Sequence, residues 1–195
     1  TRQGWFRNQS ITYKTVEKDV AEGDVFPLDT DQWGSQNING WYYMYQNTDG
    51  SFREMTFFDG TAEIGWQQNA YSAPMNEVWE MFFINNQNIF FVGENGRKPV
   101  YAFKAPASGN IDVYVEIHGT GDVHLGVYRN TDLLQTIDFV TTGTLPGGFT
   151  AHTVTMDVVK GDWVYLIGYV DDTNGNRQGW ARNHSVKYNT VGQPD

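Results

Sequence analysis

The sequence contains no cysteine, so disulfide bonds are excluded and the redox compartment is not indicated. No apolar run approaches the roughly 18 residues needed to cross a bilayer, so membrane insertion is not expected. Because there is no initiator Met and no signal peptide, we expect a processed or excised piece of a longer protein. Basic residues are scarce, with 13 Lys and Arg against 23 Asp and Glu and a net charge of -10. This balance argues against nucleic acid and anionic membranes as partners, because both need a basic face.

Catalytic motifs are also missing. The sequence has no cysteine nucleophile, no Gly-x-Ser-x-Gly elbow and no phosphate-binding loop, and its four histidines are not spaced as zinc ligands. Glu77 and Glu80 could suggest a glycosidase pair, but a spacing of three places them on opposite faces of a strand. We therefore predict that the protein is not an enzyme.

Helical periodicity is nearly absent, and apolar and polar residues alternate instead. In residues 108–119 (SGNIDVYVEIHG) the aliphatic residues face one way, while Asp112, Tyr114, Glu116 and His118 face the other. A solvated sheet face explains this second set, although a polysaccharide lyase could also use it. Strands recur roughly every 8 to 12 residues, which predicts a β-sandwich or barrel. Trp163, in the apolar segment GDWVYLIG, is expected in its core.

Aromatic residues are abundant, with 7 Trp, 11 Tyr and an aromatic content of 15%. Rigid rings suit uncharged polar ligands such as sugars, because the apolar faces of a pyranose stack on them while amides and carboxylates pair with its hydroxyls. An aromatic-rich β core is the alternative explanation. Composition alone does not separate the two.

Several segments resemble bacterial jelly-roll carbohydrate-binding modules. AFKAPASGNIDVYVEI, HLGVYRN and VTMDVVKGDWVYLIG are similar to the C-terminal half of such modules, and INGWYYMYQNTDGSFREMTFFDG is similar to modules attached to polysaccharide-degrading enzymes. Together the resemblance covers residues 38–170, most of the chain. Similar patterns occur in tumour-necrosis-factor-like jelly rolls and in the sugar-binding type first seen in anthrax protective antigen. The resemblance implies an all-β, two-sheet antiparallel β-sandwich (jelly roll) with little or no helix. It also implies a bacterial protein that is extracellular or at the cell surface.

Two segments combine aromatic residues with amides, residues 29–41 and 65–74, and a third, residues 93–98, offers hydrogen-bonding side chains after an apolar strand. Loop positions favour ligand binding over packing, although Trp33 could instead close the open end of the sandwich. The predicted ligand-binding residues are Trp33, Asn37, Trp66, Gln67, Asn69, Tyr71, Glu94, Asn95 and Arg97.

Structural calcium is the predicted cofactor. Alternating oxygen ligands in a loop suit a hard cation, and the segment DDTNGNRQG supplies them at Asp172, Asn174 and Asn176. The adjacent pair Asp171 and Asp172 could also ligate calcium, so Asp171 is included in the predicted site. Asp and Asn at alternating positions also simply build turns, so both explanations stand.

One stretch occurs twice. Residues 2–16 (RQGWFRNQSITYKTV) and 177–191 (RQGWARNHSVKYNTV) are identical at ten of fifteen positions. We treat residues 1–195 as one domain, because no linker divides the chain, and interpret residues 1–16 as the counterpart of 176–191 in a neighbouring repeat. The alternative is that both copies are strands of one sandwich.

The leading hypothesis is non-catalytic carbohydrate binding, which holds an extracellular protein or attached enzyme on a polysaccharide or oligosaccharide. Neighbouring domains in a larger protein are the other expected partners. The first alternative is a structural or adhesive repeat of a bacterial surface protein (an adhesin) without a sugar site. The second is a polysaccharide lyase or hydrolase.

Overall fold

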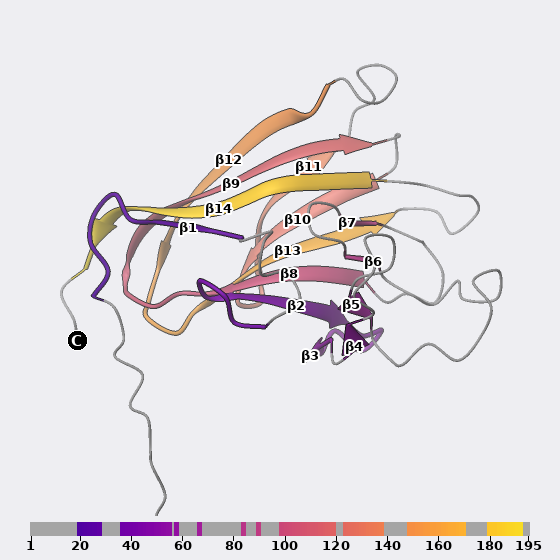
Figure 1. Cartoon of the computed structure of the whole chain (residues 1–195), viewed down its shortest axis with the longest axis horizontal. Coiled ribbons are helices and arrows are strands. Elements are labelled where there is room, and N and C mark those ends of the chain that lie inside the picture. Colours follow the sequence, from indigo (N-terminus) through magenta and orange to yellow (C-terminus); the bar gives the residue numbers. More distant parts are fainter. Residues whose placement is uncertain are drawn as a thin grey trace, which may run out of the picture.

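The computed structural model describes residues 19–28, 36–55, 57–58, 66–67, 83–84, 89–90, 98–119, 123–138, 148–170 and 179–192. Within these residues the protein is all-β, with fourteen strands and no helix (Figure 1). Membrane-spanning helices are likewise absent from this part of the chain.

Sheet A has four strands. In spatial order they are β1 (Val25–Pro27), β14 (Gly179–Val191), β9 (Gly109–Gly119) and β12 (Thr150–Val158). All neighbours pair antiparallel. The repeated stretch, in its C-terminal copy, is therefore a central strand that is paired on both sides.

Sheet B has six strands, again all antiparallel. In spatial order they are β11 (Asp132–Asp138), β10 (Val123–Arg129), β13 (Trp163–Val170), β8 (Lys98–Lys104), β2 (Trp41–Gln46) and β3 (Phe52–Glu54). Its two central strands, β13 and β8, are joined to neighbours along most of their length.

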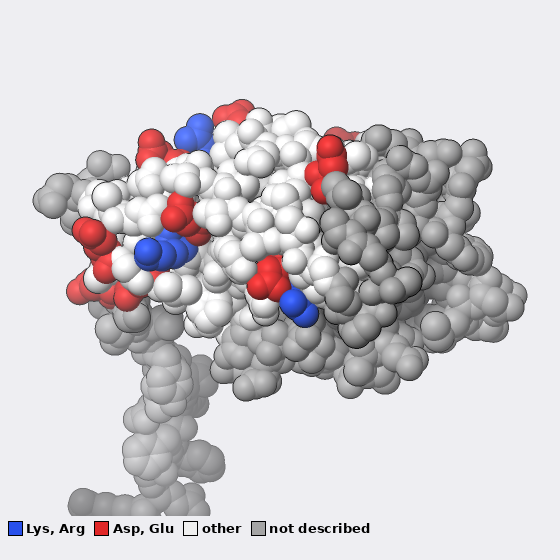
Figure 2. Space-filling view, turned by 90° about the horizontal axis from the view of Figure 1, so that it is seen from above, with Lys and Arg blue, Asp and Glu red and all other residues white. Residues whose placement is uncertain are grey.

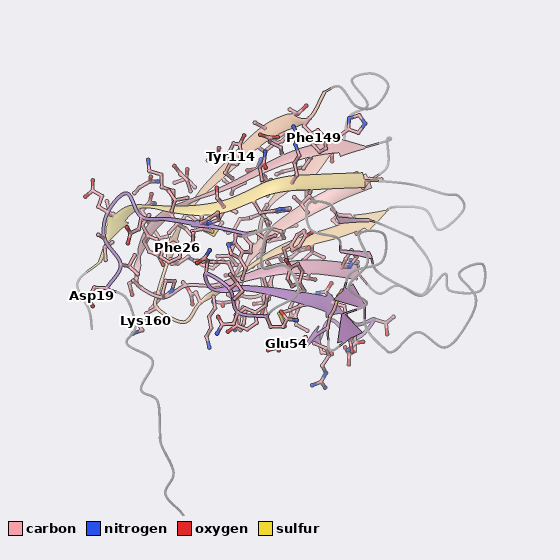
Figure 3. The ribbon with its side chains drawn as sticks, viewed as in Figure 1. Asp19, Phe26, Glu54, Tyr114, Phe149 and Lys160 are labelled. Carbon is pink, nitrogen blue, oxygen red and sulfur yellow. The ribbon has the colours of Figure 1, made fainter. Side chains whose placement is uncertain are left out.

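The two sheets pack face to face around one apolar core (Figure 1). The predicted alternation in β9 is confirmed, since Ile111, Val113, Val115 and Ile117 are at most 2% exposed. Sheet B contributes large side chains such as Trp41 and Tyr101, and Phe26 of β1 lies between the sheets (Figure 3). Burial of this apolar surface is the main stabilising term. The predicted jelly-roll β-sandwich is confirmed.

A third, small antiparallel sheet consists of two-residue strands. They are β4 (Phe57–Phe58), β5 (Trp66–Gln67), β6 (Phe83–Ile84) and β7 (Ile89–Phe90). Cα positions of β7 approach those of β14, so this end of the small sheet lies near sheet A.

Candidate functional site

The outer face of sheet B is aromatic. Alternate residues of β13, β2, β3 and β10 point away from the core and place six rings on this face, which we call the aromatic face: Tyr42, Phe52, Tyr128, Trp163, Tyr165 and Tyr169. Five of these side chains are half-buried and Tyr165 is buried. The protein thus presents partly accessible rings where a solvent-facing sheet would ordinarily carry polar groups.

Small residues of β8 allow the rings to close over the sheet. Val100 and Ala102 point outward at the middle of β8, and both are 0% exposed. Rings from the strands on either side cover them, because short side chains leave room above β8. Lys98 and Lys104 lie at the two ends of β8, and their ammonium groups lie over rings at the two ends of the aromatic face.

Three rings lie in nearly parallel planes. The Phe52 and Tyr165 centroids are 4.0 Å apart with an interplanar angle of 6°, and those of Trp163 and Tyr165 are 5.9 Å apart, also at 6°. Tyr42 meets Trp163 edge-on, with centroids 5.0 Å apart. Each such pair adds about 0.5–1.5 kcal/mol beyond area burial, so the rings hold one another rigidly.

The far side of the aromatic face is built around β10. A Cβ atom on Gly126 would lie 2.6 Å from the Tyr128 ring, so the glycine leaves the space that this ring occupies. His124 stacks on Tyr169 with centroids 5.1 Å apart, and its Nδ1 lies 2.8 Å from Asp138. The Nζ atom of Lys98 lies 4.9 Å from the Tyr169 centroid. These contacts place charged and hydrogen-bonding groups directly beside the rings.

The phenols of Tyr42, Tyr128 and Tyr165 remain neutral at physiological pH, because the pKa of each is raised. Burial raises the pKa of Tyr165, and burial followed by the charge of Glu54 raises that of Tyr42. The pKa of Tyr128 is raised by burial and then by Tyr169. Neutral phenols both donate and accept hydrogen bonds, so the face offers apolar ring surface together with paired polar groups.

The outer face of sheet A has a different character. Tyr114 Oη donates to Glu116 Oε1 at 2.9 Å, and Arg182 Nε donates to Glu116 Oε2 at 2.8 Å. The Arg182 guanidinium lies 3.7 Å from the centroid of Phe149, and Figure 3 labels Phe149 and Tyr114 on sheet A. Partial burial alone would raise the pKa of Glu116, but hydrogen bonds from Arg182, Asn183 and Tyr114 lower it overall. The structure therefore brings these residues together as a cross-strand network.

The other acid of this face is also held in place. Asp112 Oδ1 accepts a hydrogen bond from Thr155 Oγ1 at 2.6 Å, and the buried His118 has its Nδ1 atom 3.3 Å from the Gly148 carbonyl oxygen. These side chains make structural contacts across sheet A, which favours the solvated-face interpretation over a lyase. On the face shown in Figure 2, the described acidic and basic side chains are scattered and form no continuous basic patch, as the net charge predicts.

Replacement of Glu116 by Gln should lower stability by at most about 1 kcal/mol at pH 7, because Arg182 is 39% exposed and solvent screens the pair. Since the folded-state pKa is lowered, the carboxylate stabilises above pH 4.5 and this contribution disappears as pH falls through the folded pKa. Urea unfolding at pH 7 and at pH 3 measures both effects. Asp112→Asn is the matched control. A penalty equal at both pH values would contradict an ionic contribution.

The structure describes few of the predicted ligand-binding residues. Asn37 is exposed and has φ 60° in the turn before β2, so its identity suits the turn itself. Trp66 and Gln67 form β5. The predictions at Trp33, Asn69, Tyr71, Glu94, Asn95 and Arg97 lie outside the described residues.

The calcium prediction also lies outside the described part of the chain, at Asp171, Asp172, Asn174 and Asn176. Among the residues that are described, no three His, Asp or Glu side chains gather as a metal site requires.

Sequence reasoning missed the aromatic face and was wrong about Trp163. That side chain is half-buried on the outer face of sheet B rather than in the core between the sheets. The signal was present in β13, where aromatic Trp163, Tyr165 and Tyr169 occupy one parity while Val164 and Leu166 occupy the other. An all-apolar strand can thus still have two chemically different faces.

Comparisons with known proteins give structural similarities only. No family model matches the sequence, and no curated protein matches it. The family 35 carbohydrate-binding module of Abf62 from Cellvibrio japonicus is 16% identical with a TM-score of 0.39, over 78% of this chain and 98% of that one. The C-terminal family 6 module of the laminarinase LamC from Zobellia galactanivorans is 12% identical with a TM-score of 0.39, over 75% and 98%.

A third similar structure is the K3 cleaved adhesin domain of Lys-gingipain from Porphyromonas gingivalis. It is 10% identical with a TM-score of 0.38, over 74% of this chain and 91% of that one. The solved structures similar to this chain thus include carbohydrate-binding modules, the class of domain that the sequence resemblance named.

Proposed function

We propose that this chain is a non-catalytic carbohydrate-binding domain and that the aromatic face is its ligand platform. The observation that supports this is the position of six aromatic side chains, Trp163 among them, on the outer face of sheet B. A sheet face exposed only to water ordinarily carries polar groups at such positions. A pyranose ligand gains apolar contact with the rings.

The groups around the rings fit the rest of a sugar. Tyrosine hydroxyls, the Gln46 amide and the Glu54 carboxylate supply donors and acceptors on the outward positions of β2, β3, β10 and β13. The ammonium groups of Lys98 and Lys104 add donors at the ends of β8. Uncharged polysaccharide chains, which present alternating apolar faces and hydroxyls, match this combination.

The domain would hold an attached enzyme or a surface protein on extracellular polysaccharide. The predicted residues in 29–41, 65–74 and 93–98 would add contacts outside the aromatic face. A catalytic role is not proposed, because Glu116 is engaged by Arg182 and Tyr114, and Asp112 by Thr155.

The test is retention on insoluble polysaccharides and on a glycan array, with release of reducing ends measured in the same samples. We expect retention on at least one neutral polysaccharide and no new reducing ends. Complete absence of retention on every glycan would refute the proposal, and product formation would identify an enzyme instead.

A structural or adhesive repeat is the second candidate function. It is favoured by β11, an edge strand of sheet B on which Leu133 and Leu134 are 52% and 42% exposed. Exposed apolar residues on an edge strand suit pairing with another protein chain. Self-association without glycan retention would support this candidate.

Calcium is proposed as a structural ion held by Asp171, Asp172, Asn174 and Asn176. An ion present at about 100 times its Kd stabilises a fold by roughly 2.7 kcal/mol, which corresponds to a Tm shift of roughly 5–10 °C for a domain of this size. Chelator should therefore lower Tm by that amount and added Ca²⁺ should restore it. Asp172→Asn should remove the response, and Mg²⁺ is the control ion. An unchanged Tm with chelator would contradict the calcium prediction.

A further inference from the structure

We propose that residues 2–16 are the last strand of a second domain of this fold, equivalent to β14, and that residues 17–24 join the two domains. The basis is the identity of ten positions between residues 2–16 and 177–191, compared with what β14 does in the structure. Strand alternation alone would require only a pattern of apolar and polar residues. The identities instead fall on side chains with specific partners.

The first retained partner is an ion pair. Arg182 hydrogen-bonds Glu116 of β9 and lies over the ring of Phe149. Arg7 occupies the equivalent position in the N-terminal copy. A solvent-facing strand position tolerates many residues, so retention of arginine indicates a neighbouring strand that carries an acid like Glu116.

The second retained feature is a bulge. Asn183 has φ 55°, and the pairing of β14 with β9 shifts register between Arg182 and Ser185. Asparagine is among the few residues that favour this conformation. Asn8 and Ser10 keep both residue types, so the copy has the sequence of a strand with the same irregularity at the same place.

The third retained feature is the end of the strand. Tyr188 Oη donates to the Ala107 carbonyl at 2.8 Å, and Thr190 Oγ1 accepts from the backbone N–H of Asn110 at 3.2 Å. A Cβ atom on Gly109 would clash with the carbonyl oxygen of Thr190, so this approach needs glycine on β9. Tyr13 and Thr15 repeat the two side chains. The N-terminal copy therefore suits a partner whose chain resembles residues 107–110, where β9 begins in this domain.

The substitutions favour a related but different domain as this partner. Ala181, which is 0% exposed, corresponds to Phe6, and the buried His184 and Val186 correspond to Gln9 and Ile11. A phenylalanine at the closed Ala181 position would overpack this core. The N-terminal copy therefore suits a domain whose core has a related shape but different side chains. In this domain, β14 already occupies the strand position between β1 and β9.

The connection is geometrically simple. The Gly23 amide donates to the Tyr188 carbonyl at 2.8 Å, and the Tyr188 amide donates to the Asp24 carbonyl at 3.0 Å. Residues 19–24 and the end of β14 therefore lie at the same end of the sandwich (Figure 1). Eight residues span at most roughly 28 Å, so the sister domain would attach closely at this end.

The test is a fusion in which residues 19–176 are followed directly by residues 2–195, so that residues 2–16 supply the missing strand of the first unit. Three further fusions carry Phe6→Ala, a scrambled order of residues 2–16, or residues 177–191 in place of 2–16. Calorimetry of each fusion is compared with that of the 195-residue chain. The fusion with residues 177–191 and the Phe6→Ala fusion should each have roughly twice the unfolding enthalpy of the 195-residue chain. The fusion with the scrambled segment should have the same unfolding enthalpy as the 195-residue chain.

The native fusion should be less stable than the Phe6→Ala fusion, because Phe6 overpacks the Ala181 position. The proposal is overturned if the Phe6→Ala fusion behaves like the scrambled one. It is also overturned if the fusion with 177–191 gives no second folded unit, because residues 19–191 would then not be self-contained. Deletion of residues 1–18 from the chain supplies the second measurement. An unchanged Tm supports a strand that belongs elsewhere, whereas a lowered Tm places the segment in this domain's own sheet.

Discussion

Replacement of Trp163 by alanine should weaken retention on polysaccharide roughly 30-fold, or about 2 kcal/mol, as expected for loss of a large aromatic contact. Trp163 stacks beside Tyr165 and meets Tyr42 edge-on. Its loss removes ring surface from the aromatic face and removes a packing contact of both tyrosines. Tyr42→Ala should weaken retention in the same direction. Affinity electrophoresis in gels that contain the retained polysaccharide measures both effects.

Two controls separate binding from folding. Trp163→Phe keeps a ring on the aromatic face and should retain more affinity than the alanine variant. Phe149→Ala removes a half-buried ring from the opposite face, where it contacts Arg182, and should leave retention unchanged. Thermal unfolding of each variant identifies losses that come from instability.

One result would show that the ligand binds outside the aromatic face. If the Trp163 and Tyr42 variants bind like the original chain while Trp33→Ala or Trp66→Ala does not, the ligand contacts the segments predicted from sequence. The aromatic face would then have a different partner.

A fall in pH from 7 to 5 should destabilise the fold by about 2 kcal/mol through His184 alone. This imidazole is fully buried in β14, and burial lowers its pKa to about 3. Its ring lies 4.3 Å from Tyr101 and 6.3 Å from Trp41, and its Nε2 atom has no hydrogen-bond partner among the described residues. Neither neighbour carries a charge that could stabilise an imidazolium.

The direction follows from proton uptake by the unfolded chain. Below pH 6.5 His184 binds a proton in the unfolded chain, whereas in the folded protein it stays neutral until about pH 3. The free energy of unfolding therefore falls between these pH values by about 1.4 kcal/mol per pH unit. Burial lowers the pKa of the half-buried His152 too, which adds a smaller effect of the same sign. The contribution of Glu116 enters only below pH 4.5.

His184→Gln isolates this effect, and Gln9 at the equivalent position of the N-terminal copy suggests that glutamine fits such a strand. Urea unfolding at pH 7, 6 and 5 should give a clearly shallower pH dependence for the variant than for the original chain. His152→Gln serves as the matched control. Equal pH dependence in the His184→Gln variant and the original chain would show that His184 titrates normally when folded.

Strand pattern was the most reliable information in the sequence. The alternation over residues 108–119 predicted β9 and the side chains it buries, because successive residues of a strand point to opposite faces. The same rule places the aromatic residues of β13 on one face. It does not say which face is inside when both are apolar, and Trp163 was therefore assigned to the wrong one.

The alternation of residues within a strand could not predict which side chains of neighbouring strands contact each other. Glu116 and Asp112 share a face by parity, which left open a reactive pair. The pairing of β9 with β14 and β12 brings Arg182 to Glu116 and Thr155 to Asp112, and these contacts depend on register between segments distant in the chain.

The sequence by itself determined the all-β class, the acidic net charge and the correspondence of residues 2–16 with 177–191, since composition, periodicity and identity are properties of the chain alone. The tertiary structure decided which sheet face carries the rings, what holds each acid and why β14 needs its particular residues. These depend on strand order and register, which are set by packing two sheets on one core, and local alternation leaves both undetermined.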